Sequence, residues 1–200
     1  MNAVKAVPVL QARIQQGASF AGIMQEADRM ANAGYARLDM SDIKAAAEFQ
    51  MKIGNLPGFC ENHERGSTLG DTELIQYIGV EPFKRQNAVR IRALQAEAAH
   101  SGTPRTVSTS AYREATVAAL RAMPFEDGES IMRLLQRGTK ISTYEACTMG
   151  VKLLRTGMTL PQPYLDTFIV YSVTHRATPD PAPAARPERR IESPGPHLGI

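Results

Sequence analysis

The chain contains no tryptophan, and aromatic residues make up only 6% of its 200 positions. A β-sandwich relies on aromatic and β-branched side chains to fill the space between its sheets. The shortage of aromatic residues therefore counts against that architecture. A core of alanine, leucine, isoleucine, valine and the 9 methionines favours closely packed helices instead. We therefore expect an all-α, multi-helix domain.

Cysteine is scarce as well, with Cys60 and Cys147 as the two in the sequence. Two cysteines cannot build the disulfide framework of a small secreted domain. One bridge is compatible with the sequence, but we expect reduced thiols. The apolar stretch from Ala6 to Leu10 is interrupted by polar residues too soon to serve as a signal peptide. No run approaches the roughly 18 apolar residues of a membrane span, so we predict a cytoplasmic protein without a membrane partner.

The common catalytic and cofactor motifs are absent. The sequence has neither a glycine-rich phosphate-binding pattern, nor the H-E-x-x-H zinc motif, nor the G-x-S-x-G nucleophile motif. Cys60 and His63 have the spacing of two zinc ligands, but a structural zinc site needs four, and the remaining cysteine and histidines are isolated. We predict that the protein is not an enzyme and binds neither a metal nor a cofactor.

Acidic residues cluster at Glu126, Asp127 and Glu129, close to the start of a predicted helix. Such a cluster can bind a cation. Carboxylates at this position also oppose the positive end of the helix dipole. We favour this second interpretation, because it needs no ligand.

Helical patterns separated by glycine and proline fill most of the chain. Apolar residues recur every three or four positions, which predicts about eight or nine short helices. Glycine and proline mark residues 54–70 as a loop. Residues 101–109 are a polar linker, so we divide the chain into an N-terminal helical half, 1–100, and a C-terminal helical half, 110–175.

Several residues are typical of helix ends. We predict N-caps at Ser19, at Ser41 or Asp42, at Ser110 and at Ser142. Glu145 follows Ser142 at the spacing of a capping box, in which the two side chains satisfy each other's backbone N–H groups. Gly34 is expected to end a helix in the left-handed conformation.

The last two segments differ from the rest. Residues 166–174 have high β propensity and would suit a short strand. Because the sequence offers this strand no partner, a buried helix over 164–175 is the better prediction. Six prolines and the loss of apolar periodicity over 176–200 predict a disordered, proline-rich tail.

The segment 71–98 resembles a helix-turn-helix motif. A short helix with Leu74, Ile75 and Ile78 is followed by Gly79 and by a second helix that we expect to begin at Pro82. The second helix, 82–98, carries four positive charges and no negative one as far as Ala96. We expect its apolar face to be Phe83, Ile91, Leu94 and Ala98.

The outward side of this helix provides the candidate nucleic-acid-binding residues. Lysine and arginine neutralise phosphates, and arginine, glutamine and asparagine can pair with base edges. The candidates are Lys84, Arg85, Gln86, Asn87, Arg90 and Arg92. Arg85 departs from the motif, because that position normally packs an apolar side chain against the first helix. A helical hairpin with a solvated basic face explains the same residues without DNA.

Two functions follow from these observations. The first is a DNA-binding regulatory or accessory protein that contacts double-stranded DNA through the basic helix, 82–98, as a homo-oligomer. The second is a helical adaptor or assembly protein, such as a chaperone, secretion or virion component, which binds another protein through methionine- and alanine-rich faces.

Overall fold

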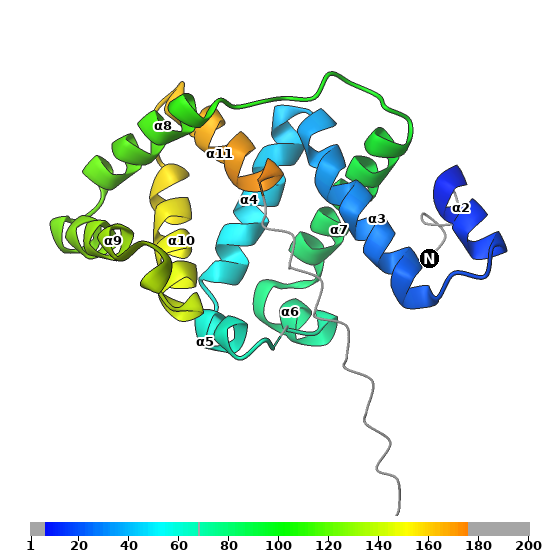
Figure 1. The fold of residues 1–200 in the computed structure, drawn as a ribbon, viewed down its shortest axis with the longest axis horizontal. Helices are drawn as coiled ribbons and strands as arrows, with labels where there is room; N and C mark the ends of the chain where they lie inside the picture. The colour runs from blue at the N-terminus through cyan, green and yellow to red at the C-terminus, as the bar shows by residue number, and fades with distance from the viewer. Residues whose placement is uncertain (1–6, 68, 176–200) are drawn as a thin grey trace, which may run out of the picture.

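The computed structural model describes residues 7–67 and 69–175, and these form ten α-helices, two 3-10 helices and no strand. The expected all-α architecture is therefore confirmed (Figure 1). The helices are α2 (Pro8–Gln15), α3 (Phe20–Gly34), η1 (Tyr35–Arg37), α4 (Met40–Gly54), α5 (Phe59–Glu64), α6 (Asp71–Ile78), α7 (Val80–Ala98), α8 (Thr109–Ala122), α9 (Phe125–Arg137), η2 (Gly138–Lys140), α10 (Thr143–Gly157) and α11 (Tyr164–Thr174).

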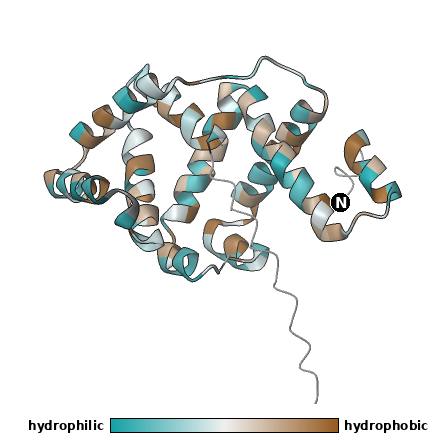
Figure 2. Ribbon diagram, in the orientation of Figure 1, coloured by the Kyte–Doolittle hydropathy of each residue, from teal (hydrophilic) through white to brown (hydrophobic). Residues whose placement is uncertain are grey.

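Most helices carry hydrophilic and hydrophobic residues on the same ribbon (Figure 2), as expected for helices that bury one face. The main cluster of buried residues joins η1, α4, α7 and α11. Ala46 of α4, Val89 of α7 and Ile169 of α11 all belong to it, and each is at most 1% exposed. Helices from both halves of the chain thus share one core.

Two further clusters extend this core. One packs α2 against α3 and α7 through Leu10, Met30 and Leu94. The other joins α8 to α11 through Ala115, Ala119 and Phe168, together with Leu160. Alanines on α8 keep its contact surface flat, so the large ring of Phe168 can lie close to the helix.

The most extensive contact between two helices in the described residues is that of α3 with α7. Gly34 permits this contact at the end of α3, because a Cβ atom there would collide with the backbone carbonyl of Ala93 on α7. The left-handed conformation expected for Gly34 is wrong, since its φ is −71°. Its role is close packing of two backbones.

The predicted N-caps are confirmed at some helices and wrong at others. Ser19 accepts a hydrogen bond from the backbone of Gly22, and Ser142 forms the expected capping box with Glu145. The cap of α4 is Asp39, neither Ser41 nor Asp42. The cap of α8 is Ser108, two residues before Ser110. Both helices therefore begin earlier than predicted.

Two segments expected as irregular or ambiguous are helical. Residues 54–70, predicted as a loop, contain the short helix α5. Residues 164–174 form α11, so the strand considered for 166–174 is wrong and the helix is confirmed. Burial of Ile169, Val170 and Val173 against α4 and η1 outweighs their β propensity. The predicted disordered tail, 176–200, lies outside the described residues.

The segment between α7 and α8 is fastened to η1. The backbone N–H of Arg105 donates to the carbonyl of Ala36 at 2.7 Å, and Arg37 donates to the carbonyl of Gly102 at 3.1 Å. This segment crosses one edge of the molecule between the two helices (Figure 1). The division of the chain at 101–109 stays a prediction.

Candidate functional site

The segment resembling a helix-turn-helix has the expected order of elements. The backbone N–H of Gly70 donates to the carboxylate of Glu73 and fixes the start of α6. Gly79, with φ of 87°, makes the turn, a conformation that glycine adopts without strain. Helix α7 begins at Val80, not at Pro82 as expected, so Gly79 alone separates α6 from α7.

The first two candidate residues are exposed at the N-terminal end of α7. The ammonium of Lys84 donates to the carboxylate of Glu81 at 3.1 Å, one turn earlier. Arg85 is exposed and forms no ion pair within the described residues. Of these two cations, Arg85 is therefore the one whose charge is not already balanced by a neighbouring carboxylate.

The next two candidates lie on different sides of α7. Asn87 is exposed, whereas Gln86 is buried at 9% exposure. The amide nitrogen of Gln86 donates to the hydroxyl of Tyr35 at 2.9 Å. Gln86 thus faces the core, and its expected place on the outer flank is wrong. In this position it cannot reach a base edge unless α7 separates from η1.

The last two candidates connect α7 to its neighbours. The guanidinium of Arg90 forms an ion pair with Asp28 of α3. Arg92 donates to both carboxylate oxygens of Asp42 on α4, with Nε at 2.7 Å from Oδ2. This hydrogen bond to Asp42 raises the pKa of Arg92 further above its ordinary value. Both charges are balanced inside the molecule, which reduces their attraction for phosphate.

The packed face of α7 also differs from the expectation. Ile91 is 39% exposed, while Val89, Ala93 and Leu94 are buried together with Gln86. Because α7 packs against α3 on one side and α4 on the other, small residues such as Ala93 suit its contact face. Of the expected apolar face, Leu94 is buried and Ala98 packs against its cluster, as predicted, whereas the buried position expected for Ile91 is wrong.

Cys60 and Cys147 form a disulfide, so the expected reduced thiols are a wrong prediction. The bridge joins α5 to α10 across 87 positions of sequence, with the two Cα atoms 5.6 Å apart. His63 stacks its ring on Phe59, with the two ring centroids 6.4 Å apart. Disulfides persist mainly in oxidising compartments, so the bridge counts against a cytoplasmic location. That location stays a prediction.

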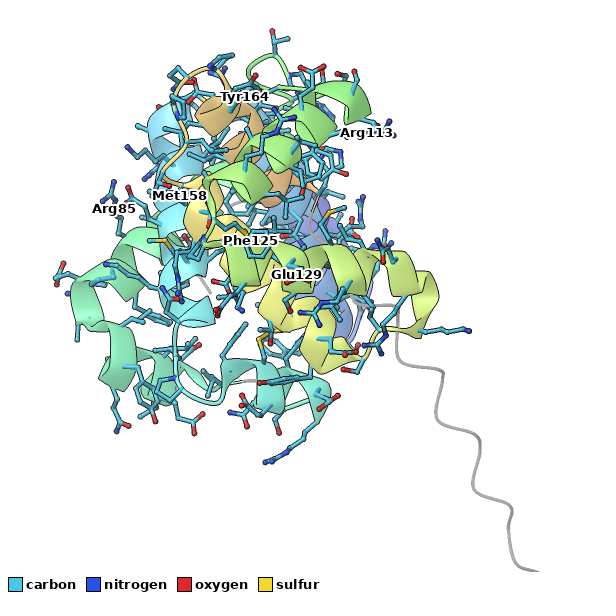
Figure 3. The ribbon with its side chains drawn as sticks, turned by 90° about the vertical axis from the view of Figure 1, so that its left-hand side faces the viewer. Arg85, Arg113, Phe125, Glu129, Met158 and Tyr164 are labelled. Carbon is cyan, nitrogen blue, oxygen red and sulfur yellow. A yellow bond between two sulfur atoms is a disulfide. The ribbon has the colours of Figure 1, made fainter. Side chains whose placement is uncertain are left out.

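Helix α9 carries a surface feature that was not predicted from the sequence. Phe125 is 83% exposed, Leu135 48% and Met132 46%. At 100° per residue these three side chains fall within an arc of roughly 80°. We call them the α9 ridge. Helix α9 lies at an edge of the molecule in Figure 1 and faces the viewer in Figure 3, where Phe125 and Glu129 are labelled.

Few contacts hold α9 in place. Ile131 is its one buried residue. Asp127 accepts a hydrogen bond from Lys152 of α10 at 2.5 Å, and Arg137 forms an ion pair with Glu145. Asp127 pairs with Lys152, whereas the other two acids of the cluster, Glu126 and Glu129, are exposed and form no ion pair within the described residues. The sequence signal for the ridge was the recurrence of apolar residues at helical spacing, at positions 125, 132 and 135.

In comparisons with family models, curated proteins and solved structures, none matches this chain. Within the described residues, no helix combines the length and apolar character that a membrane span needs. The functional assignment therefore rests on the surfaces of the molecule itself. Two of them stand out, the cationic end of α7 and the α9 ridge.

Proposed function

We propose that the protein is a helical assembly protein that pairs with a second copy of itself through α9. The observation that carries this proposal is the exposure of Phe125, at 83%, on a helix with a single buried residue. Contiguous exposed apolar patches mark protein interaction sites on soluble proteins. Met132 adds a flexible side chain that adapts to a facing surface.

The charges beside the ridge favour a second copy as the partner. Glu126 and Glu129 precede Arg133 and Arg137 along α9, and at 100° per residue these four side chains share an arc of roughly 80°. When two copies of α9 pair in antiparallel fashion, the acidic half of one helix faces the basic half of the other. A two-fold axis at position 131 brings Glu129 opposite Arg133 twice.

The same register fits the apolar side chains. Met132 then lies beside the two-fold axis, and Phe125 lies near Leu135 of the second copy. Glu129 and Arg133 form no ion pair within the described residues, so both are available. Because α9 is about 20 Å long, the interface is small, and we expect a dissociation constant on the order of 1–100 µM.

The test is sedimentation velocity over a concentration series. We expect the mass to rise toward twice the 21.8 kDa of the chain, and Phe125→Glu to remain monomeric. Phe20→Glu is the matched control, because Phe20 is 68% exposed on α3, outside the proposed interface. A Phe125→Glu protein that still dimerises would exclude the α9 interface.

A charge exchange tests the antiparallel register. Glu129→Arg or Arg133→Glu alone places like charges opposite each other, so each should weaken the dimer about tenfold. The double variant restores opposite charges and should recover the affinity. If the double variant is as weak as the single ones, the register proposed here is wrong.

A second candidate function is DNA binding through the N-terminal end of α7. It is favoured by the exposure of Lys84, Arg85 and Asn87 directly after the turn at Gly79. Fluorescence anisotropy with a random duplex at several salt concentrations tests it. We expect Arg85→Ala to weaken binding and lower the salt slope by about one, and Arg113→Ala on α8 to change neither. Equal affinity of the Arg85→Ala protein and the unchanged chain would exclude this surface.

A further inference from the structure

Helix α2 is attached to the rest of the molecule by one narrow stripe. Leu10 and the residue before the helix, Val7, are buried, whereas residues 8–9 and 11–15 are exposed. Within the described residues, no side-chain hydrogen bond or ion pair joins α2 to another helix. A helix of 8 residues is not stable alone in water, so its buried contacts keep α2 folded. The surface that receives Val7 and Leu10, the α2 seat, consists of Ala27, Met30 and Ala31 of α3 and Leu94 of α7.

The hinge between α2 and α3 is short and depends on a glycine. It consists of residues 16–19, between the end of α2 and the start of α3. Gly17 has a left-handed φ of 76°, and the backbone N–H of Ala18 donates to the carbonyl of Arg13 at 3.1 Å, which ends α2. The hinge contains no proline, so its residues can also adopt helical dihedral angles. In that conformation α2 and α3 join into one helix, 8–34.

A continuous helix over 8–34 moves α2 off its own seat. At 1.5 Å per residue, Leu10 then lies roughly 25 Å along the helix axis from Ala27, so the two side chains of one chain cannot meet. The vacated seat has the shape of α2, and a second copy of the chain can supply that helix. The same buried contacts re-form between the two copies, so exchange costs little beyond the change in the hinge. Short hinges favour such exchange.

Phe20 gains a contact in the exchanged form. It is 68% exposed at the start of α3, and residues 21–22 beside it are exposed as well. At 100° per residue, a continuous helix places Phe20 within an arc of roughly 100° with Leu10, Ala27 and Ala31. When Leu10 of each copy fills the seat of the other, the two helices are antiparallel, and their two-fold axis lies close to position 20. Two Phe20 rings then pack together, a contact that the closed monomer lacks.

We propose that α2 exchanges between two copies of the chain, each filling the α2 seat of the other. The partner is a second copy, because its α2 carries the side chains that fill this seat in the structure. The tethered α2 competes at an effective concentration on the order of 1 mM, so the exchanged dimer dominates only near or above that concentration. At lower concentrations the closed form prevails.

The exchange interface is separate from the α9 ridge, because α2 and α9 lie at opposite ends of the molecule (Figure 1). The exchange itself does not depend on pairing through α9. One consequence does rest on the proposed function. A chain that uses both interfaces has two different neighbours, each related to it by its own two-fold axis, so the assembly continues beyond a dimer.

The experiment uses the full chain carrying Phe125→Glu, so that its outcome is independent of the α9 interface. The protein is incubated at about 1 mM, diluted rapidly and analysed by size-exclusion chromatography with light scattering. We expect a dimer of twice the 21.8 kDa of the chain. This dimer should dissociate slowly after dilution, because α2 must leave the seat of the second copy first. If the protein is monomeric after this incubation, and remains so with Gly17→Ala added, the proposal is overturned.

Two further variants in the same background test the hinge and the seat. Alanine disfavours the left-handed conformation of the closed hinge, so Gly17→Ala should form the dimer at a concentration roughly tenfold lower. Gly66→Ala is the matched control, since Gly66 ends α5 with a left-handed φ of 69° outside the exchange interface. Leu10→Asp removes the side chain that fills the seat and should abolish the dimer. A dimer that persists in Leu10→Asp, or that responds equally to both glycine variants, would contradict exchange of α2.

Discussion

The effect of a glycine within a helix depends on what surrounds it, and Gly34 and Gly150 show the two extremes. Gly34 lies where a Cβ atom would strike the backbone of Ala93, whereas a Cβ atom on Gly150 of α10 would meet nothing within 4 Å. A backbone carbonyl cannot move aside as a side chain can. The same substitution should therefore have opposite effects at the two positions.

We predict that Gly34→Ala lowers the free energy of unfolding by about 3 kcal/mol, because α3 must shift away from α7. Gly150→Ala should raise it by about 0.5–1 kcal/mol, since alanine loses less backbone entropy in a helix. Urea unfolding followed by far-UV circular dichroism measures both. Equal stability of the Gly34→Ala protein and the unchanged chain would show that the two helices are not in backbone contact.

Local sequence predicts residues whose function is local. Ser19 and the pair of Ser142 with Glu145 were identified correctly, because a cap contacts only the next three residues. The caps of α4 and α8 were placed two or three residues too late, because several polar residues near each start could have served. Gly34 was assigned the wrong role, because its packing partner lies on α7, far away in the sequence. Gln86 was placed outside for the same reason, since Tyr35 lies 51 positions earlier.

At the scale of elements, α5 depends on a tie to the rest of the fold. It has six residues, too few for a helix to be stable alone in water. Its contacts with α10 include the Cys60–Cys147 bridge. Reduction of the disulfide should therefore unfold α5 locally before it destabilises the longer helices.

We predict that reduction of the bridge lowers the free energy of unfolding by about 4 kcal/mol, given the long loop that it closes. Hydrogen exchange should accelerate in residues 59–64 on reduction and change little in α7. The Cys60→Ala/Cys147→Ala double variant is the control, since it should not respond to reductant. If both redox states of the unchanged chain unfold at the same urea concentration, the bridge carries no stability.

Helix α7 shows why the predicted site was only partly placed correctly. Its basic composition identified an exposed end, with Lys84, Arg85 and Asn87. The sequence could not reveal that Arg90 and Arg92 meet acids of α3 and α4, because those pairs span at least 50 positions. The ridge of α9 was missed because periodicity cannot distinguish a face that packs in the core from one left open.

At the scale of the whole molecule, α11 connects the two halves that the polar linker, 101–109, appeared to separate in the sequence. Ile169 and Val173 lie in the same buried cluster as Ala46 and Val89. Phe168 of the same helix packs against α8. One helix thus contributes to the core of each half, which couples their stabilities.

We therefore predict a single unfolding transition for both halves. Native-state hydrogen exchange in increasing urea should give α7 and α8 the same free energy of opening. Ile169→Ala should lower both values together by about 3 kcal/mol, because the cavity lies in the shared cluster. Ala88→Gly at an exposed position of α7 is a mild control, expected to cost about 1 kcal/mol without changing the coupling. If Ile169→Ala lowers the value for one half and spares the other, the chain consists of two domains divided at the linker, and each half then has a stability of its own.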